Sequence, residues 1–239
     1  YYLGPAHLWF LGNIYLYVWL SLPLIYFLKA HPEGRFARGI RQLMGSSWAW
    51  VVIMAAFVLE VVLVKPDSFA YYAQNLHGFL LGGLAYLFGF LLIYSGRSFW
   101  ELLLRYRWIL LVLAVSLYLL RWFYFDWAPP EYLLAIESNL WIFTWFALGY
   151  RYLNRDSQAL GYLSRSAYPV YILHMVFSYA ASVLILPLDI APLWKFALVS
   201  VLTFGGCYLG YEGIRRVKLL RPLFGLSWSG NQQPRTGSQ

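Results

Sequence analysis

Apolar residues occur in long runs along this chain, and short polar stretches separate the runs. A helix needs about 20 mostly apolar residues to cross the hydrocarbon core of a bilayer. The runs are 17 to 22 residues long and apolar nearly all round, without the strict alternation of β-barrel strands. The pattern therefore predicts an all-α, polytopic bundle of transmembrane helices with about seven spans. The predicted spans are Leu8–Leu28, Trp48–Val64, Leu76–Ser95, Trp108–Phe125, Tyr132–Tyr150, Ala167–Leu186 and Leu193–Ile214.

The composition agrees with a membrane protein. Apolar residues make up 61% of the 239 residues, and charged residues make up 12%, about half their share in an ordinary soluble domain. A soluble domain of this size has no interior large enough for so much apolar surface. The net charge of +8 does not indicate a nucleic-acid partner, because the basic residues lie between apolar runs rather than along one face. The expected partner is a lipid bilayer.

The basic residues are divided unequally between the two sides of the predicted bundle. Fifteen of the 18 lysines and arginines fall in the first, third and fifth loops and in the C-terminal segment. The opposite loops hold Lys65 and Lys195, and Arg121 lies inside a span. Cytoplasmic loops carry an excess of Lys and Arg, so we predict that the C-terminus is cytoplasmic. We expect one membrane domain over residues 1–226 and a disordered cytoplasmic tail over residues 227–239.

Charged side chains lie within the predicted spans, where each costs about 2.5–3.5 kcal/mol on insertion scales. Glu60, Arg121, Glu137 and Asn139 all lie toward the outer ends of their spans. Because a carboxylate has a short reach, we predict a functional or paired role for Glu60 and Glu137. Arg121 is a suitable ion-pair partner for either glutamate. If these groups face inward, they line a polar cavity that opens to the outer side.

Other polar residues open spans from the same side. His7 and Asn13 begin the first predicted span, and Asn75 and His77 begin the third. For Asn75 and His77 the favoured interpretation is anchoring at the membrane interface. Snorkelling toward the interface is an equal alternative for Arg121.

The sixth predicted span carries a polar face. Tyr168, Tyr171, His174 and Ser178 are spaced three, three and four residues apart, which places them on one side of a helix. Pro169 is expected in the first turn, where its missing N–H costs little. The imidazole of His174 can act as a general base or orient a substrate. The alternative is a histidine satisfied by hydrogen bonds between helices.

Three stretches resemble one known family. His7-Leu8-Trp9-Phe10-Leu11 is similar to a motif that opens a middle span in the membrane acyltransferase 3 family. Leu160 to His174, ending Tyr171-Ile172-Leu173-His174, resembles a late motif of that family. The ending Arg221-Pro222-Leu223-Phe224-Gly225-Leu226 is also similar to the close of its chains. The nearest subgroup is the glucan biosynthesis protein C-like one.

The resemblance implies a bacterial inner-membrane O-acyltransferase. Such an enzyme moves an acetyl, succinyl or similar group from a cytoplasmic acyl-CoA-type cosubstrate to a hydroxyl of a periplasmic or lipid-linked glycan. No bound cofactor and no metal is expected. The family has about ten helices, so we expect about three further helices before Tyr1, with the family's main catalytic arginine and histidine among them.

The candidate site residues combine motif positions with the polar groups inside spans. We predict His174 and Tyr171 as catalytic residues. The predicted substrate-binding residues are His7, Trp9, Asn13, Glu60, Arg121 and Glu137.

Other classes of membrane protein remain open. A transporter or flippase could use Glu60, Arg121, Glu137 and His174 as a relay, although no internal repeat or matched pair of broken spans is present. A retinal pump is disfavoured, because no lysine lies in the middle of a span. A different membrane O-acyltransferase fold also uses an intramembrane histidine, and only the motifs argue against it.

Overall fold

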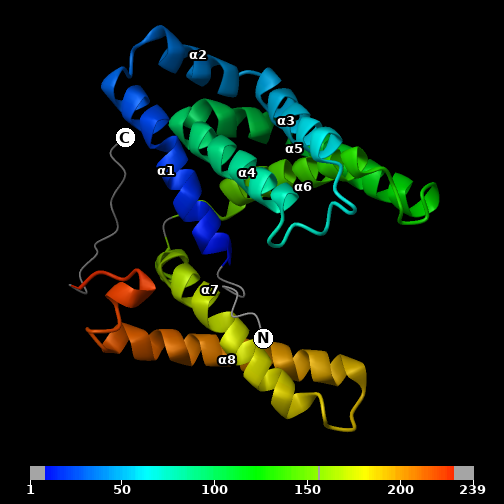
Figure 1. Cartoon of the computed structure of the whole chain (residues 1–239), viewed down its shortest axis with the longest axis vertical. Helices are drawn as coiled ribbons and strands as arrows, with labels where there is room; N and C mark the ends of the chain where they lie inside the picture. The colour runs from blue at the N-terminus through cyan, green and yellow to red at the C-terminus, as the bar shows by residue number, and fades with distance from the viewer. Residues whose placement is uncertain (1–8, 156, 229–239) are drawn as a thin grey trace. The chain divides into compact units, whose positions relative to one another are not determined.

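The computed structural model describes residues 9–155 and 157–228, and within these ranges it contains helices and no strands (Figure 1). The all-α prediction is therefore confirmed, and each of the seven predicted spans corresponds to a helix. His7 and the predicted tail from residue 229 onward lie outside the described residues. The helices are α1 (Trp9–Ala30), α2 (Arg35–Met44), α3 (Trp48–Val64), α4 (Leu76–Tyr94), α5 (Arg97–Phe123), α6 (Glu131–Tyr152), α7 (Gln158–Ile185) and α8 (Pro192–Arg216), followed by the 3-10 turn η2 (Pro222–Phe224).

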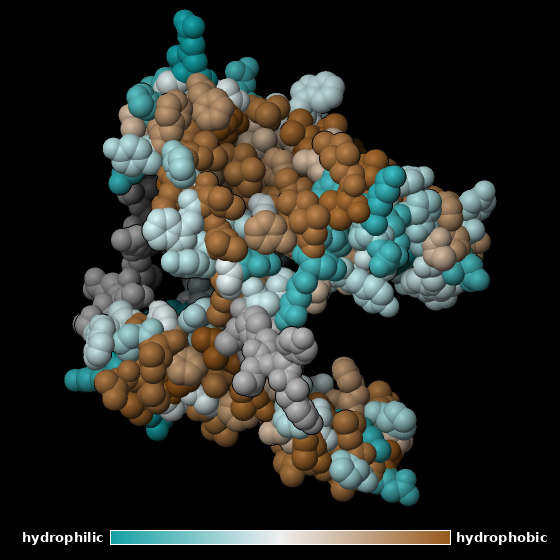
Figure 2. Space-filling model, in the orientation of Figure 1, coloured by the Kyte–Doolittle hydropathy of each residue, from teal (hydrophilic) through white to brown (hydrophobic). Residues whose placement is uncertain are grey.

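Most of these helices have the length and composition of membrane spans. Five described helices qualify singly, namely α1, α4, α5, α7 and α8, and α2 with α3 forms a sixth element that is sharply bent. In α6 the adjacent polar residues Glu137, Ser138 and Asn139 interrupt the apolar run. Hydrophobic residues cover much of the visible helix surface, and hydrophilic ones lie mostly near helix ends (Figure 2). The chain is a membrane protein, in rough agreement with about seven predicted spans.

Two helices begin about ten residues earlier than the apolar pattern predicts. Helix α5 begins at Arg97 rather than Trp108, and α7 begins at Gln158 rather than Ala167. Arginine is a good helix former, so a run of basic residues marks the edge of the lipid and not the end of a helix. With 27 residues, α5 is about 40 Å long and extends past a hydrocarbon core of about 30 Å.

The early start of α7 corrects the place predicted for Pro169. This proline lies in the interior of α7 and not in its first turn. It has no N–H to donate to the carbonyl of Arg165, four residues earlier. The helix consequently lacks one backbone hydrogen bond just before Tyr171 and His174.

The chain divides into two compact units between Asn154 and Arg155, and we call the first unit 1 and the second unit 2. In unit 1, α5 packs on α6, α3 packs on both α6 and α4, and α1 packs on α4. Tyr17 of α1 lies against Gly82 and Gly83 of α4, where a Cβ on Gly82 would come within 2.8 Å of the tyrosine oxygen. The buried core of unit 1 includes Met44, Ala49, Ile53, Phe57, Leu92, Phe99, Leu103, Leu110, Ala114, Leu140, Phe143 and Ala147.

Unit 2 is a helical hairpin of α7 and α8 with η2. Gly206 and Gly210 of α8 lie directly against Phe177 of α7, and a Cβ at Gly210 would also come within 2.9 Å of Leu173. The two glycines therefore allow close approach of the helices.

Candidate functional site

Polar groups gather at one end of unit 1. Helices α3 and α5 end there, and α4 and α6 begin there, as shown by a hydrogen bond of 2.7 Å from the N–H of Phe69, in the α3–α4 loop, to Glu131 Oε2 at the start of α6. This is the end that carries few basic residues. The charge pattern predicts that this end faces outward, so we call the groups described next the outer-end cluster: Glu60, His77, Phe69, Glu131, Arg121 and Glu137.

The innermost part of the outer-end cluster is a buried carboxylate–imidazole pair. His77 Nδ1 lies 2.9 Å from Glu60 Oε1 and 3.1 Å from Oε2. The side chains are 2% and 5% exposed, respectively. Glu60 sits one turn before the end of α3 and His77 is the second residue of α4, so the antiparallel helices bring both to one depth.

The partners of His77 define how the pair holds its protons. Its Nε2 lies 3.3 Å from the carbonyl oxygen of Phe69, which can only accept, so Nε2 carries a hydrogen. The other ring nitrogen faces Glu60. One further proton is therefore shared between Nδ1 and the Glu60 carboxyl, and the pair has no net charge in either arrangement. Such a pair avoids the large cost of an isolated buried charge.

Phe69 links this pair to the start of α6. Its N–H donates to Glu131, its carbonyl accepts from His77, and its ring meets the imidazole edge-on with centroids 5.5 Å apart. Through Phe69 the α3–α4 loop is bonded to both α4 and α6.

Arg121 of α5 forms the second charged pair of the outer-end cluster. Its Nη2 lies 3.2 Å from Glu137 Oε1 of α6. The guanidinium also lies over the rings of Tyr118 and Trp127, at 5.3 and 5.2 Å from their centroids. Trp127 has a positive φ of 67°, which is uncommon for a bulky residue, and this turn brings its ring over Arg121.

Replacement of Arg121 by methionine is expected to lower the free energy of unfolding by about 3 kcal/mol, because Glu137 is left buried without its cation. Arg121→Lys keeps the charge and loses the planar stacking, so it should cost about 1 kcal/mol. The measurement is loss of helical circular dichroism during denaturant titration in lipid–detergent micelles. Equal losses for the two variants would contradict a charge-pairing role.

The structure resolves which partners the predicted residues take. Arg121 pairs with Glu137, one of the two expected partners, and Glu60 pairs with His77 instead. The interfacial interpretation of His77 is therefore wrong, because the side chain is buried. Asn75 caps α4 by accepting from the N–H of Gly78 at 2.7 Å.

Two further predicted polar residues lie apart from these pairs. Asn139 donates to the carbonyl of Ala135 in its own helix, at 2.8 Å, so its buried amide is satisfied locally. Asn13 is half-buried on α1.

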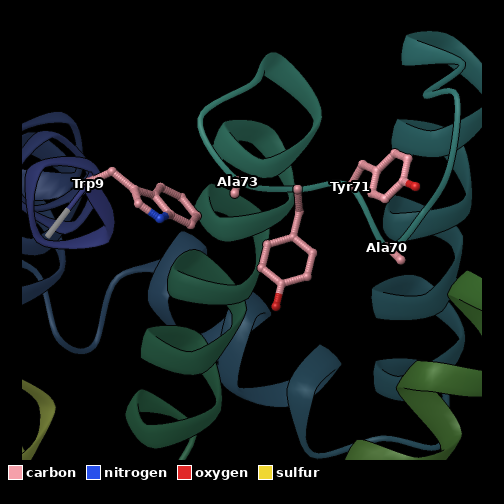
Figure 3. A pocket seen from close by; sticks show the side chains of 5 residues that line it. Trp9, Ala70, Tyr71 and Ala73 are labelled. Atoms are coloured by element: carbon pink, nitrogen blue, oxygen red, sulfur yellow. The ribbon is translucent and has the colours of Figure 1, made fainter. Parts of the chain in front are cut away.

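A pocket of about 560 Å³ lies near the start of α1. Trp9 of α1 lines it together with Ala70, Tyr71, Tyr72 and Ala73 of the α3–α4 loop (Figure 3). Its lining residues are aromatic and small, and carry no charge. Trp9 thus borders this pocket, whereas Glu60 and Glu137 are buried in pairs. Among the described residues, no cluster of His, Cys, Asp and Glu could hold a metal ion.

The second candidate centre is His174 in unit 2. Its Nδ1 lies 2.6 Å from the main-chain carbonyl oxygen of Tyr171, and the two rings are 5.7 Å apart. A carbonyl oxygen can only accept, so Nδ1 carries the hydrogen and the lone pair of the neutral ring is on Nε2. Both residues are half-buried on helix α7, after Pro169. The hydrogen bond fixes the orientation of the imidazole, and in the neutral ring Nε2 is the nitrogen that can take a proton.

Sequence reasoning missed a polar group where α7 begins and α8 ends. The Tyr162 hydroxyl donates to Glu212 Oε1 at 3.0 Å, and Arg215 Nη2 lies 3.1 Å from Glu212 Oε2. Neither Glu212 nor Arg215, which lie at the end of the last predicted span, was a candidate site residue. Tyr162 escaped notice because the predicted span began after it.

The described residues therefore provide a buried outer-end cluster in unit 1 and an oriented histidine in unit 2. Comparisons of the chain with protein-family models, with curated proteins and with solved structures gave no match.

Proposed function

We propose that the chain is an integral-membrane O-acyltransferase that acts on a hydroxyl of a glycan. The observation that carries the proposal is the hydrogen bond from His174 Nδ1 to the Tyr171 carbonyl, which leaves the lone pair of the neutral ring on Nε2. The motif around these residues supplies the reaction class, through its resemblance to membrane acyltransferases. An intramembrane base of this kind suits acyl transfer, in which a weakly acidic hydroxyl must lose its proton.

The proposed reaction proceeds by addition and elimination. His174 Nε2 takes the proton of the acceptor hydroxyl as its oxygen attacks the carbonyl carbon of an acyl thioester. A C–O bond forms and, when the tetrahedral intermediate collapses, the C–S bond breaks. The imidazolium then returns its proton to the leaving thiolate, which departs as a thiol. Tyr171 is a positioning residue, because its main-chain carbonyl orients the imidazole.

The charge pattern supports the direction of transfer. An acyl-CoA-type donor is cytoplasmic, and the strongly basic side of the bundle matches the cytoplasmic face of a bacterial inner membrane, with the C-terminus inside. The acceptor is a periplasmic or lipid-linked glycan, approached from the outer side. Glu60, Arg121 and Glu137 shape the outer end through their pairs. The reaction uses no bound cofactor.

The test is to assay glycan acylation in a strain that lacks the gene encoding this chain. Acylated glycan should disappear and return with the whole gene, but not with a His174→Ala version produced at the same level. Mass spectrometry of the extracted glycan measures the acyl groups. Normal acylation in the deletion strain would refute the proposal.

A transporter or flippase is the second candidate, and the buried Glu60–His77 pair favours it. A neutral pair that shares one proton inside a membrane protein is a suitable element of a proton relay. Proteoliposomes separate the two functions. Solute uptake that needs no acyl donor and stops with Glu60→Gln would support transport, whereas donor-dependent glycan acylation would support the enzyme.

A further inference from the structure

Helix α2 is a short basic element that the hydropathy pattern did not predict. It meets α3 at an angle of 91° across a break at residues 45–47. It contains three arginines in ten residues, so it cannot lie in the hydrocarbon core. If α3 runs across the bilayer, α2 lies close to the plane of the membrane, at the end of unit 1 opposite the outer-end cluster (Figure 1).

The side chains of α2 divide into three faces. Ala37 and Met44 are buried against unit 1, at 1% and 2% exposure. Phe36 and Leu43 lie on one flank and remain 54% and 39% exposed. The exposed polar residues Arg35, Arg38 and Gln42 occupy the remaining face. A helix with an apolar flank beside a basic face is typical of elements that lie in a membrane interface.

The two exposed arginines, Arg35 and Arg38, have no anionic partner among the described residues, whereas Arg41 has one. The carboxylate of Glu33 lies 3.4 Å from Arg41, which also donates to the Pro32 carbonyl and lies over the Tyr94 ring. No ion pair is formed by Arg35 or Arg38 within the described ranges. Both lie in the first half of α2, where the helix dipole disfavours a positive charge. An external anion would relieve that unfavourable arrangement.

We propose that α2 docks on anionic phospholipid headgroups, with Arg35 and Arg38 at the phosphates and Phe36 and Leu43 at the edge of the acyl chains. The occupant follows from the charge and from the apolar flank. A soluble anion would match the arginines but leave Phe36 and Leu43 in water. An anionic lipid satisfies both.

The position of α2 can be measured with spin labels in the full chain, reconstituted in phosphatidylcholine with phosphatidylglycerol. A Cys207→Ser background removes the native thiol, and Phe36→Cys or Gln42→Cys then introduces one label. The label at position 36 should be more accessible to oxygen, and the label at position 42 to a water-soluble nickel reagent. High nickel accessibility at both positions would overturn the proposal.

Lipid preference supplies the second readout. Spin-labelled phosphatidylglycerol should associate with the protein more strongly than spin-labelled phosphatidylcholine. The double variant Arg35→Gln/Arg38→Gln should weaken that preference severalfold. Each arginine near the membrane surface contributes at most about a fivefold factor. The matched double variant with lysines at both positions keeps the charge and should retain most of the preference. If the glutamine variant folds normally and its lipid preference is unchanged, the proposal is overturned.

Discussion

Replacement of His77 by leucine is expected to destabilise unit 1 by about 3–5 kcal/mol, because it removes one partner from a buried carboxylate–imidazole pair. The carboxyl of Glu60, whose side chain is 5% exposed, would stay buried and would lose the group that shares its proton. The carbonyl of Phe69 would also lose the N–H of the imidazole. The free energy of unfolding can be measured in lipid–detergent micelles by denaturant titration, with tryptophan fluorescence as the probe.

A second substitution identifies the source of this loss. Glu60→Gln alone should cost about 1 kcal/mol, because an amide can still donate to Nδ1 of a neutral His77. Added to His77→Leu, the same substitution removes the unpaired carboxyl and should restore part of the lost stability. A double variant less stable than His77→Leu alone would show that the two residues do not form a compensating pair. Maleimide labelling of the buried Cys207 provides a control. This cysteine lies in unit 2, so it should react at the same rate in the variants as in the original protein.

Hydropathy predicted the seven main helices correctly because apolar content is the property that lipid selects. The same property does not locate helix ends. Helix α5 begins with residues Arg97 to Arg107 although their hydropathy is low, because arginine favours the helical backbone. Helix α2 was missed for a related reason, because its arginines made residues 35–44 look like a loop. Phe36, Ile40 and Leu43, spaced four and three apart, were the signal that could have revealed it.

The candidate site was only partly predictable. Opposite charges at matching depth predicted that Arg121 pairs with Glu60 or Glu137, and the structure selects Glu137. The Glu60–His77 pair was not predicted, because the sequence alone left two carboxylates as alternatives for one arginine. Burial of His77 depends on how α4 packs beside α3, and a histidine near a span end gives no sign of it. The hydrogen bond that fixes the tautomer of His174 depends on a side-chain rotamer, which spacing does not determine.

Replacement of His174 by glutamine is expected to lower the turnover number for glycan acylation by about 10²–10⁴-fold, the usual contribution of a general base. This expectation depends on the proposed function. Glutamine can still donate to the Tyr171 carbonyl but cannot take a proton from the acceptor. The KM for the acceptor should stay within about threefold, because the lost interaction belongs to the transition state. The measurement is initial acylation rates in membranes over a range of acceptor concentrations.

Three comparisons separate catalysis from packing at His174. Ser178→Ala, on the same face of α7, should leave the turnover number nearly unchanged. Tyr171→Phe retains the main-chain carbonyl that orients the imidazole, so it should also have a small effect. In His174→Ala, added imidazole should restore part of the rate, because a free base can enter the space left by the side chain. A large rise in KM with an unchanged turnover number, or no rescue by imidazole, would instead assign His174 a role in packing or acceptor binding.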